Sequence, residues 1–426
     1  MLTRKMKESG IDWIGEVPED WEISTIGSHY TERTDKVSDV DYGPLSVTKN
    51  GIVPQLEIAA KSSNHDNRKL VLKDDFVINS RSDRKMSAGI SNMDGSVSVI
   101  NTVLYSNTID RNYTKYLLKN YAFAEEFYRW GTGIVDDLWS TKWLKMKNIP
   151  IPVPPSEKQK QIGAVIDCMF QNTNNIINET KQSITELKKY RQSVITEAVT
   201  KGLNPTVKMK ESGIEWIGSI PSNWRVRKIK HDFSLKGRIG WQGLNSKEYQ
   251  AAGPYLITGT DFKKGIINWN SCVRISEARF EEAPEIHIKE NDLLITKDGT
   301  IGKVSLAINV PKKVSLNSGV LLVREKFKNS INKNFMYYNL LSNMFWNWYN
   351  SNDQGASTIQ HLYQGQFYNY SYATPPSREQ QQIVQYLDDK ISIIDKLIEN
   401  KTKVIKELEN YKKSLIYEYV TGKKEM

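Results

Sequence analysis

The segments PPSEKQKQI at 154–162 and PPSREQQQI at 375–383 open the two stretches of sequence that decide the fold. The first stretch closes with ELKKYRQSVITEAVT at 186–200, and the second closes with ELENYKKSLIYEYVT at 407–421. The offset is the same, 221 residues, from 154 to 375 and from 186 to 407. A repeat without any insertion is what one rigid helix requires, so each stretch is predicted to be a single continuous helix.

Both helices are predicted to begin at a serine that follows two prolines. Ser156 and Ser377 are the candidate N-cap residues, and Gln159 and Gln380 stand three residues further on, at the spacing of a capping box. The prolines lack the backbone donor that would continue a helix toward the amino terminus. The start of each helix is therefore expected to be sharp.

Apolar side chains in both stretches recur mostly at steps of three or four residues, with no Gly or Pro from 164 to 201 or from 383 to 421. About 45 residues at 1.5 Å each give a helix of roughly 65 Å. Such a long repeat favours a coiled coil in which the two copies pair as a spacer, with two ordinary core helices of one globular domain as the alternative. The predicted coiled-coil and partner-docking positions are Ile162, Ile166, Ile184, Leu187, Tyr190, Val194, Ile383, Leu387, Ile391, Ile394, Leu408, Tyr411 and Leu415.

A second repeat supports the first. MKESGIDWIGEVPEDWEI at 6–23 returns as MKESGIEWIGSIPSNWRV at 209–226, an offset of 203 residues from 6 to 209. Each copy carries two tryptophans framed by Gly and Pro, which are predicted to pack the segment against its own module rather than to form an aromatic ligand platform. These tryptophans are Trp13, Trp21, Trp216 and Trp224.

The regions between the repeats differ from each other in sequence and are predicted to be mixed globules rich in strands. In both, an acidic turn leads into a short apolar strand, since KDDFVINSR at 73–81 corresponds to ENDLLITKD at 290–298. Aromatic stretches at 113–130 and 335–349 are predicted to be helical.

The predicted fold class is α+β, with two α/β-mixed modules separated by two long helices and an internal pseudo-two-fold repeat. The expected domains are a first module over 1–153, a first spacer helix over 154–203, a second module over 204–374, and a second spacer helix with a tail over 375–426.

The composition sets mild limits on function. The 426 residues include 59 Lys and Arg against 49 Asp and Glu, a formal net charge of +10, which points weakly to nucleic acid and fits a solvated basic surface equally well. Cys168 and Cys272 form neither a disulfide framework nor a CxxC pair, as expected in a reducing cytosol. Neither a signal peptide nor an 18-residue apolar run is found, so a cytoplasmic protein is expected.

The sequence contains no clear catalytic motif. DGTIGK at 298–303 has only two residues between its glycines, so it lacks the GxxxxGK[ST] spacing of a phosphate loop and is predicted to be a turn with Gly at positive φ. The five histidines lack metal-ligand spacing. Asp292 with Lys297 is compatible with a metal-dependent nuclease site, but a turn before a strand is favoured. The chain is predicted to bind and not to catalyse.

The repeated segments hold two modules of different sequence, an arrangement that is suited to binding a DNA duplex. Each module would read a short segment of the duplex, and the two half-sites would differ. Polar side chains at strand ends and turns would read base edges, and phosphate contacts would fix the register. Each candidate is also explained as an ordinary surface residue. The candidates are Lys49, Asn50, Arg68, Ser80, Arg81, Arg84 and Lys85 in the first module, and Arg238, Trp241, Gln242, Lys263, Lys264, Lys297, Thr300 and Lys303 in the second.

Two copies of GI(D/E)WIGx(V/I)PxxW, two of PPSxxQxQI at the head of a long helix, and divergent regions between them resemble the specificity subunit of type I restriction–modification systems. The resemblance covers essentially the whole chain. It implies that the divergent regions are target-recognition domains, each reading one half of a split DNA site. It also implies that the repeated helices form an antiparallel coiled coil, which sets the gap and docks two modification subunits.

The same resemblance places every cofactor in a partner. The methyltransferase subunits would carry S-adenosylmethionine and methylate adenine, and two restriction subunits would use ATP and Mg²⁺. No cofactor, metal site or catalytic residue is expected in this chain. The family has no short base-contact motif, so the candidate base readers rest on the residue pattern alone.

Three other functions remain compatible with the residues. The chain could be a repressor or architectural protein that binds DNA alone, or a coiled-coil adaptor whose two modules bind proteins. A nuclease that uses Asp292 is the third, and it would require metal-dependent cleavage by the purified chain.

Overall fold

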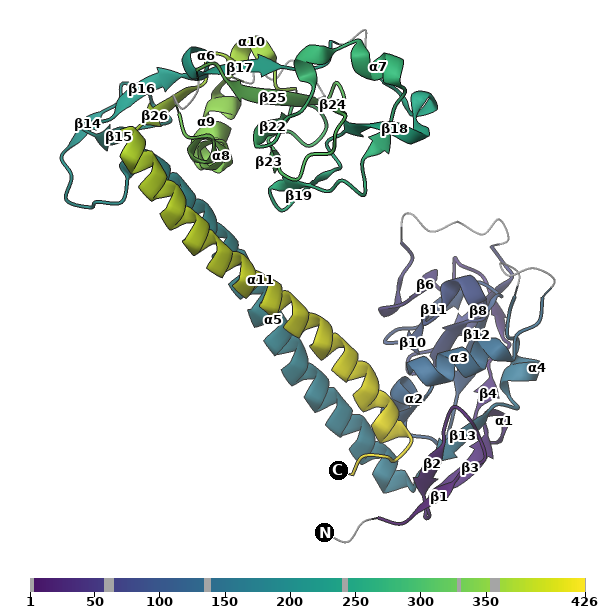
Figure 1. Ribbon diagram of the computed structural model, residues 1–426. Helices are drawn as coiled ribbons and strands as arrows, with labels where there is room; N and C mark the ends of the chain where they lie inside the picture. Colours follow the sequence, from purple (N-terminus) through teal and green to yellow (C-terminus); the bar gives the residue numbers. More distant parts are fainter. Residues whose placement is uncertain are drawn as a thin grey trace. The chain divides into compact units, whose positions relative to one another are not determined.

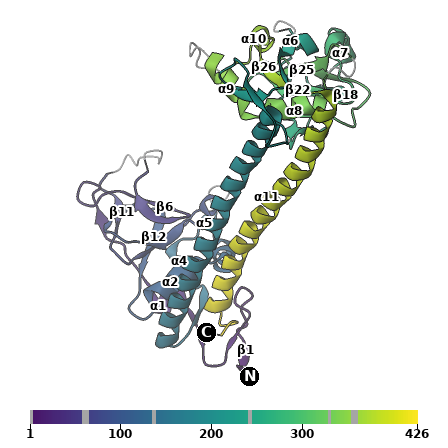
Figure 2. The same cartoon turned by 90° about the vertical axis from the view of Figure 1, so that its left-hand side faces the viewer.

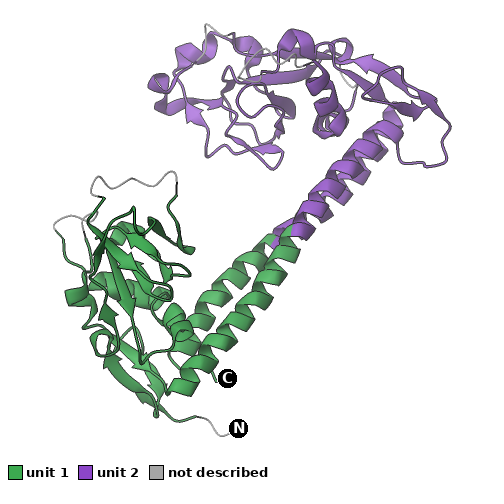
Figure 3. Cartoon of the chain, turned by 180° about the vertical axis from the view of Figure 1, so that it is seen from behind, with its two compact units in different colours: residues 1–181, 402–426 green, residues 182–401 purple. Residues whose placement is uncertain are grey.

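The computed structural model describes residues 4–56, 65–133, 139–239, 244–327, 331–352 and 361–425. The chain forms two compact units, one made of residues 1–181 and 402–426 and the other of residues 182–401 (Figure 3). Two long helices, α5 (Ser156–Lys201) and α11 (Ser377–Val420), each continue from one unit into the other. Each unit therefore contains the amino-terminal half of one long helix and the carboxyl-terminal half of the other.

The first unit is built on a four-stranded antiparallel sheet of order β10-β9-β12-β4, with a smaller sheet of order β11-β8-β5 and a β6–β7 hairpin (Figure 1). Its elements are β1 (Met6–Glu8), β2 (Glu16–Pro18), β3 (Glu22–Thr25), α1 (Ile26–His29), β4 (Thr31–Glu32), β5 (Lys36–Val37), β6 (Leu45–Thr48), β7 (Gly51–Pro54), β8 (Arg68–Val71), β9 (Phe76–Asn79), β10 (Ala88–Ile90), β11 (Gly95–Val97), β12 (Asn101–Tyr105), α2 (Arg111–Leu117), α3 (Tyr121–Arg129), α4 (Trp143–Met146) and β13 (Pro150–Val153).

The second unit repeats this plan with a six-stranded sheet of order β17-β25-β22-β23-β20-β19 and a smaller sheet of order β21-β18-β24. Its elements are β14 (Met209–Glu211), β15 (Ser219–Pro221), β16 (Arg225–Lys228), α6 (Ile229–Asp232), β17 (Phe233–Lys236), β18 (Gln250–Ile257), β19 (Phe262–Lys263), β20 (Ile266–Ile267), β21 (Val273–Arg274), α7 (Glu277–Glu281), β22 (Asp292–Thr296), β23 (Val304–Ala307), β24 (Val314–Leu316), β25 (Val320–Glu325), α8 (Lys333–Leu341), α9 (Asn343–Asn352), α10 (Gln364–Phe367) and β26 (Ser371–Thr374).

The two main sheets share one strand order, because β4-β12-β9-β10 in the first unit matches β17-β25-β22-β23 in the second. The equivalent inner strands β9 and β22 are buried along their whole length because both of their faces are covered, and their central residues are apolar. Ile78 and Ile295 face the core that contains the long helices, whereas Val77 and Leu294 face the core under the smaller sheet. The predicted α+β class with two mixed modules and an internal repeat is confirmed.

The turn before each of these strands is held by a buried carboxylate. Asp75 Oδ2 accepts the backbone N–H of Leu72 (2.8 Å), and Asp292 Oδ2 accepts that of Lys289 (2.7 Å). Both carboxylates lie in the interior and pair with an arginine, which offsets the cost of burying the charge. The prediction of an acidic turn before an apolar strand is correct in both modules.

The long helices pair antiparallel within each unit, where their halves lie side by side (Figure 2). In the first unit, Lys412 Nζ of α11 donates to Asn174 Oδ1 of α5 (2.8 Å), and in the second unit Arg191 of α5 pairs with Asp395 of α11 (2.9 Å). The 221-residue offset relates Asn174 to Asp395 and Arg191 to Lys412. Both units therefore make the same cross-helix contact between a basic side chain and an oxygen acceptor, and the predicted coiled coil is confirmed.

Most of the predicted coiled-coil positions lie in or beside the two cores. Ile162, Ile166, Val194, Ile383, Leu387, Ile391, Ile394 and Leu415 are buried, and Ile184, Leu187 and Leu408 are half-buried. Tyr190 and Tyr411 are 53 % and 46 % exposed, so of the two predicted roles only partner docking fits them, and it stays a prediction. A pair of helices buries only a narrow seam, and residues just outside that seam stay open to solvent.

The predicted capping boxes are also wrong. The amide N–H of Gln159 bonds to the carbonyl of Pro155 (3.1 Å), and that of Gln380 bonds to the carbonyl of Pro376 (3.0 Å). Each proline therefore occupies the N-cap position, and Ser156 and Ser377 are the first helical residues.

The glutamine side chains instead join each long helix to the module beside it. Gln159 Oε1 accepts the backbone N–H of Asp110 (2.7 Å), the N-cap residue of α2, and Gln380 Oε1 accepts that of Asn332 (2.8 Å), the N-cap residue of α8. Their amide groups donate to the carbonyls of Pro154 and Pro375, both at 2.9 Å. A buried tertiary contact thus replaces the local cap that the spacing predicted.

The tryptophan segments pack at the carboxyl ends of the long helices. Trp21 and Trp224 are fully buried, so the predicted packing role is confirmed for them. Gly422 and Gly202 follow the ends of α11 and α5 at φ of 73° and 75°, and a Cβ at either position would lie 3.1 Å from the neighbouring indole. Glycine is required there by conformation and by space.

Candidate nucleic-acid interface

The tip of the β6–β7 hairpin presents two of the predicted DNA-binding residues. Thr48 pairs with Gly51, so Lys49 and Asn50 form the two-residue turn, and both are exposed. Thr48 Oγ1 donates to the carbonyl of Gly51 (2.9 Å) and accepts the N–H of Asn50 (3.1 Å), which fixes the turn. An ammonium and a carboxamide on a rigid tip are suited to phosphate oxygens and base edges.

The hairpin lies close to the segment that joins β9 to β10. A Cβ built on Gly89 of β10 would lie only 3.0 Å from Cα of Gly51, so the two backbones are in contact. Arg84, in the 3₁₀ turn Ser82–Arg84 of this joining segment, has a side chain that is 67 % exposed. The hairpin that carries Lys49 and Asn50 thus lies beside β10, and Arg84 lies in the segment that leads into β10.

A groove of about 570 Å³ in the first unit contains Ser80 and Arg81. The Ser80 hydroxyl donates inward to the carbonyl of Ile100 (2.6 Å) and Ser80 is buried, so its proposed role as a surface reader is not supported by its position. Arg81 remains at the groove. Lys142 and Leu144, which is 71 % exposed, also line this groove and were missed by the sequence reasoning. The mixed basic and aromatic run TKWLKMK at 141–147 is the signal that could have identified them.

Two other candidates of the first unit are already engaged within the protein. Arg68 is 4 % exposed, and its guanidinium donates to Ser96 Oγ (2.8 Å) and to the Ser96 carbonyl (3.0 Å). Burial lowers the pKa of Arg68, because the charged form loses hydration. Lys85 pairs with both carboxylate oxygens of Glu125 (3.0 and 3.1 Å). Arg68 is a core residue, and placing it among the surface readers was wrong.

In the second unit, the loop between β22 and β23 carries Lys297, Thr300 and Lys303 together. Thr296 Oγ1 donates to the carbonyl of Thr300 (2.6 Å) and accepts the N–H of Lys303 (2.9 Å), which closes the loop. Gly299 and Gly302 have φ of 70° and 75°, as the predicted turn requires.

This loop is attached to its surroundings at two points. Asp298 pairs with His361, and Lys303 Nζ donates to the carbonyl of Gly259 (3.4 Å). Thr300 is exposed, and Lys297 is half-exposed. A loop that is fixed by such contacts and exposes hydrogen-bond donors can bind in a DNA groove without a large loss of conformational entropy.

Lys263 and Lys264 lie at the β19–β20 hairpin. Lys264 and Gly265 both have positive φ, 51° and 81°, as in a type I′ turn. Lys264 Nζ lies 3.4 Å from Glu399 of α11, so this lysine faces the long helix within its own unit.

Arg238, a further candidate of the second unit, does not lie at an accessible surface. Arg238 is 1 % exposed and donates to the carbonyl of Leu316 (2.9 Å) and to Ser315 Oγ (3.0 Å), and burial lowers its pKa. Its assignment as a DNA reader was therefore wrong, for the same reason as that of Arg68. Trp241 and Gln242 lie outside the described residues.

The geometry around Asp292 does not favour a nuclease site. Arg324 Nε donates to Asp292 Oδ1 (3.0 Å), and the carboxylate also holds its turn. Among the residues that the structure describes, no group of three or more His, Cys, Asp or Glu is arranged to hold a metal ion. Within the same ranges, no helix is long and apolar enough to cross a membrane.

Comparison with known proteins points to one family. Residues 221–410 match the family described as type I restriction modification DNA specificity domain. The putative type I restriction enzyme MjaX specificity subunit of Methanocaldococcus jannaschii is 23 % identical, over 96 % of this chain and 95 % of that protein. The EcoBI specificity subunit of Escherichia coli is 22 % identical over 39 % of this chain and 37 % of that protein.

Two solved structures share the fold. A chain from a study of complex assembly and conformational transition of the type I R-M system aligns with a TM-score of 0.71 and 14 % identity, covering 95 % of this chain and 98 % of that one. The HsdS subunit of Thermoanaerobacter tengcongensis aligns with a TM-score of 0.57 and 16 % identity, over 97 % and 99 % of the two chains. At these identities the likeness concerns the fold.

Proposed function

We propose that the chain is a type I restriction–modification specificity subunit, because residues 221–410 match that family and a relative of that description aligns over 96 % of the chain, and that its two modules read the two different halves of one bipartite, asymmetric DNA site. The chain is a non-catalytic, DNA-recognising component of such a system. Its contribution to methylation or cleavage is to select the sequence on which partner subunits act.

One observation carries this proposal. The modules share a strand order but present different side chains from equivalent places, since the segment after β9 bears Arg81 and Arg84 and the loop after β22 bears Lys297, Thr300 and Lys303. Because the two modules share one strand order, each is placed in the same way on the long-helix halves of its own unit. Different loop chemistry gives each module its own sequence preference.

Partner subunits are proposed to dock on apolar side chains that the helices leave open. Ile176 and Leu397 are related by the 221-residue offset and are 48 % and 44 % exposed, and Tyr190 and Tyr411 form a second such pair. Exposed apolar positions that recur in both units are typical of protein interfaces. Two equivalent patches suit two copies of a modification subunit.

The cofactors are proposed to reside in those partners. S-adenosylmethionine would be bound by the two modification subunits, and ATP with Mg²⁺ by two restriction subunits. The chain would then position the modification subunits over adenines in each half-site.

The docking surface is tested by replacing Tyr190 and Tyr411 with aspartate and co-purifying the chain with its modification subunit. The double variant should lose the partner, because each aspartate places an unpaired charge in the interface. A matched variant with alanine at the exposed neighbours Lys189 and Asn410 should retain it. Equal retention by both variants would remove these tyrosines from the interface.

The bipartite reading is tested by selecting bound duplexes from a random library with the reconstituted complex. The selected duplexes should share two short blocks of different sequence, separated by a gap without preference. A single continuous block would contradict the proposal.

A further inference from the structure

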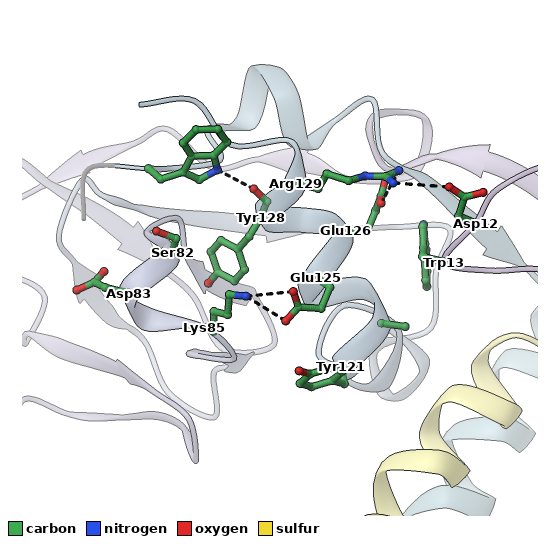
Figure 4. Close-up of a pocket in the computed structure, with 12 residues that line it drawn as sticks. Asp12, Trp13, Ser82, Asp83, Lys85, Tyr121, Glu125, Glu126, Tyr128 and Arg129 are labelled. Atoms are coloured by element: carbon green, nitrogen blue, oxygen red, sulfur yellow. Dashed lines mark hydrogen bonds and ion pairs between the residues drawn. The ribbon is translucent and has the colours of Figure 1, made fainter. Parts of the chain in front are cut away.

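The first unit contains a second pocket, which the DNA-reading surface does not use. It lies between the tryptophan segment, the 3₁₀ turn Ser82–Arg84 and helix α3, and it has a volume of about 1140 Å³ (Figure 4). Asp12 and Trp13 come from the first of these elements, and Tyr121 comes from the start of α3.

The charge of this pocket is opposite to that of the chain as a whole. Four carboxylates line it and only two cations do, whereas the protein has a net charge of +10. A wall with excess negative charge repels phosphates and attracts cations. The carboxylates are Asp12, Asp83, Glu125 and Glu126, and the cations are Lys85 and Arg129.

Aromatic side chains form much of the remaining wall. They are Trp13, Tyr121, Tyr128 and Trp139. Tyr121 is 61 % exposed, although it is a large aromatic residue. Trp13 is 7 % exposed, and its indole N–H has no acceptor among the described residues. Aromatic rings combined with carboxylates are the chemistry that recognises an ammonium or guanidinium group.

Cations of the chain itself already pair with these carboxylates, since Arg129 lies near Glu126 (2.8 Å) and Asp12 (3.7 Å), and Arg84 lies near Asp83 (3.3 Å). Lys85 Nζ contacts both carboxylate oxygens of Glu125 (3.0 and 3.1 Å) and lies 5.9 Å from the centre of the Tyr128 ring (Figure 4). The pair lies at the surface, with side chains that are 47 % and 48 % exposed. An arginine is a stronger ligand for such a site than lysine, because its planar fork makes two parallel bonds to a carboxylate and stacks on aromatic rings.

We propose that this pocket binds a basic segment of a partner protein, with one arginine or lysine side chain entering between Glu125, Asp83 and the aromatic wall. The segment competes with Lys85 for Glu125. Because the pocket repels phosphates, this binding is separate from DNA reading and compatible with it.

Among the described residues, the carboxylates that α3 contributes to this site have no counterpart on the equivalent helix of the second unit. Helix α9 is the counterpart of α3 in the second unit, and its sequence NMFWNWYNSN contains no carboxylate. The duplicated helices offer two equivalent surfaces, whereas this pocket offers one. A protein bound here is therefore expected at one copy for each chain.

The test is a titration of the full-length chain with a fluorescent peptide that carries three arginines spaced by Gly-Ser, followed by anisotropy. Wild-type chain should bind it, and a D83N/E125Q variant should bind about tenfold more weakly, because two carboxylates near the ligand are removed. The peptide with citrulline in place of arginine should not bind, because it keeps the shape and loses the charge.

The control is Glu277→Gln, which removes an exposed carboxylate of the second unit that pairs with Lys313 (2.6 Å). It should bind the arginine peptide as the wild type does. Equal binding by D83N/E125Q, or equal binding of the citrulline peptide, would overturn the proposal. A variant with alanine at Lys49 and Asn50, which should lose one half-site, should bind the arginine peptide as the wild type does, so this test and that of DNA recognition fail independently.

Discussion

Lys49 and Arg68 are basic residues of the same module, but they have opposite environments. Lys49 stands on the tip of the β6–β7 hairpin, whereas the Arg68 guanidinium is buried against Ser96. Both follow polar runs in the sequence, and neither run shows which side of the sheet its side chain faces. Only the packing of β8 against β11 determines that Arg68 points inward.

Replacing Lys49 and Asn50 by alanine should weaken binding of one half-site by about 1–3 kcal/mol for a lost base contact, with no change in thermal stability. Arg68→Met should have the converse effect. It leaves Ser96 without its buried donor and should lower the free energy of unfolding by about 1–3 kcal/mol without changing the recognised sequence. Thermal unfolding and selection from a random duplex library measure the two effects. Loss of specificity in the methionine variant, with unchanged stability, would place Arg68 at the DNA.

Buried tyrosines make the stability of the protein sensitive to alkaline pH. Burial raises the pKa of Tyr113, and burial followed by the hydrogen bond to Asp232 raises that of Tyr372, above the ordinary 10.0. A phenol whose pKa is raised in the folded state stabilises the fold fully below its unfolded pKa, and that contribution is lost as the pH rises above about 10. The melting temperature should therefore fall steeply above about pH 10.

The Tyr372→Phe variant distinguishes the loss of stability on ionisation of Tyr372 from other causes of unfolding at high pH. It removes the bond to Asp232 (2.6 Å), so stability at neutral pH should be lower than in the wild type, but the decline above about pH 10 should be shallower. Identical slopes for both proteins would show that Tyr372 does not contribute to the alkaline transition.

At the scale of elements, each module is fixed to its long helix by the same two contacts. Gln159 and Gln380 accept an N–H from the N-cap residue of α2 or α8. Six residues further along each module, Tyr116 donates to Asp167 and Tyr338 donates to Asp388, the latter at 2.6 Å. The repetition of both contacts explains why these glutamines recur in the two copies of the repeat.

Gln159→Ala should destabilise the first module by about 1–3 kcal/mol, because it leaves a buried N–H and a buried carbonyl unpaired, and Gln380→Ala should do the same in the second. Gln161 and Gln382 lie two residues further along the same helices and are exposed, so alanine there should be neutral. Hydrogen exchange at Asp110 and Asn332 reports each bond directly. Unchanged exchange at these amides in the Gln159 and Gln380 variants would contradict the assignment.

The repeats allowed the elements to be predicted well, because periodicity and offset are properties of the sequence itself. The helix lengths, their pairing and the buried strands at 76–79 and 292–296 follow from patterns of apolar residues. The N-cap residues could not be predicted from such patterns, because Gln159 bonds to a residue distant in sequence, which local spacing does not reveal. Likewise, Arg238 and Leu144 show that burial of a charged residue and exposure of an apolar one are decided by neighbours distant in sequence.

At the scale of the whole chain, the long helices are proposed to set the gap between the half-sites. The boundaries of the compact units fall at equivalent positions of α5 and α11, between 181 and 182 and between 401 and 402. Adding four residues between Thr180 and Ile184, together with the matching insertion in α11, should lengthen the paired helices by about 6 Å. At about 3.4 Å per base pair, the preferred gap should grow by roughly two base pairs. An unchanged gap in the selected duplexes would rule out the helices as the ruler.

This chain alone is proposed to select a split and asymmetric DNA site for a methyltransferase partner. We would co-express the chain with that partner and map adenine methylation on a random DNA library by single-molecule sequencing. Methylation should be confined to one motif with two different half-sites and a fixed gap, and replacing Lys49 and Asn50 should remove the preference in one half. Methylation without such a motif, or a motif that stays the same when the two modules are exchanged for those of another family member, would contradict this proposal.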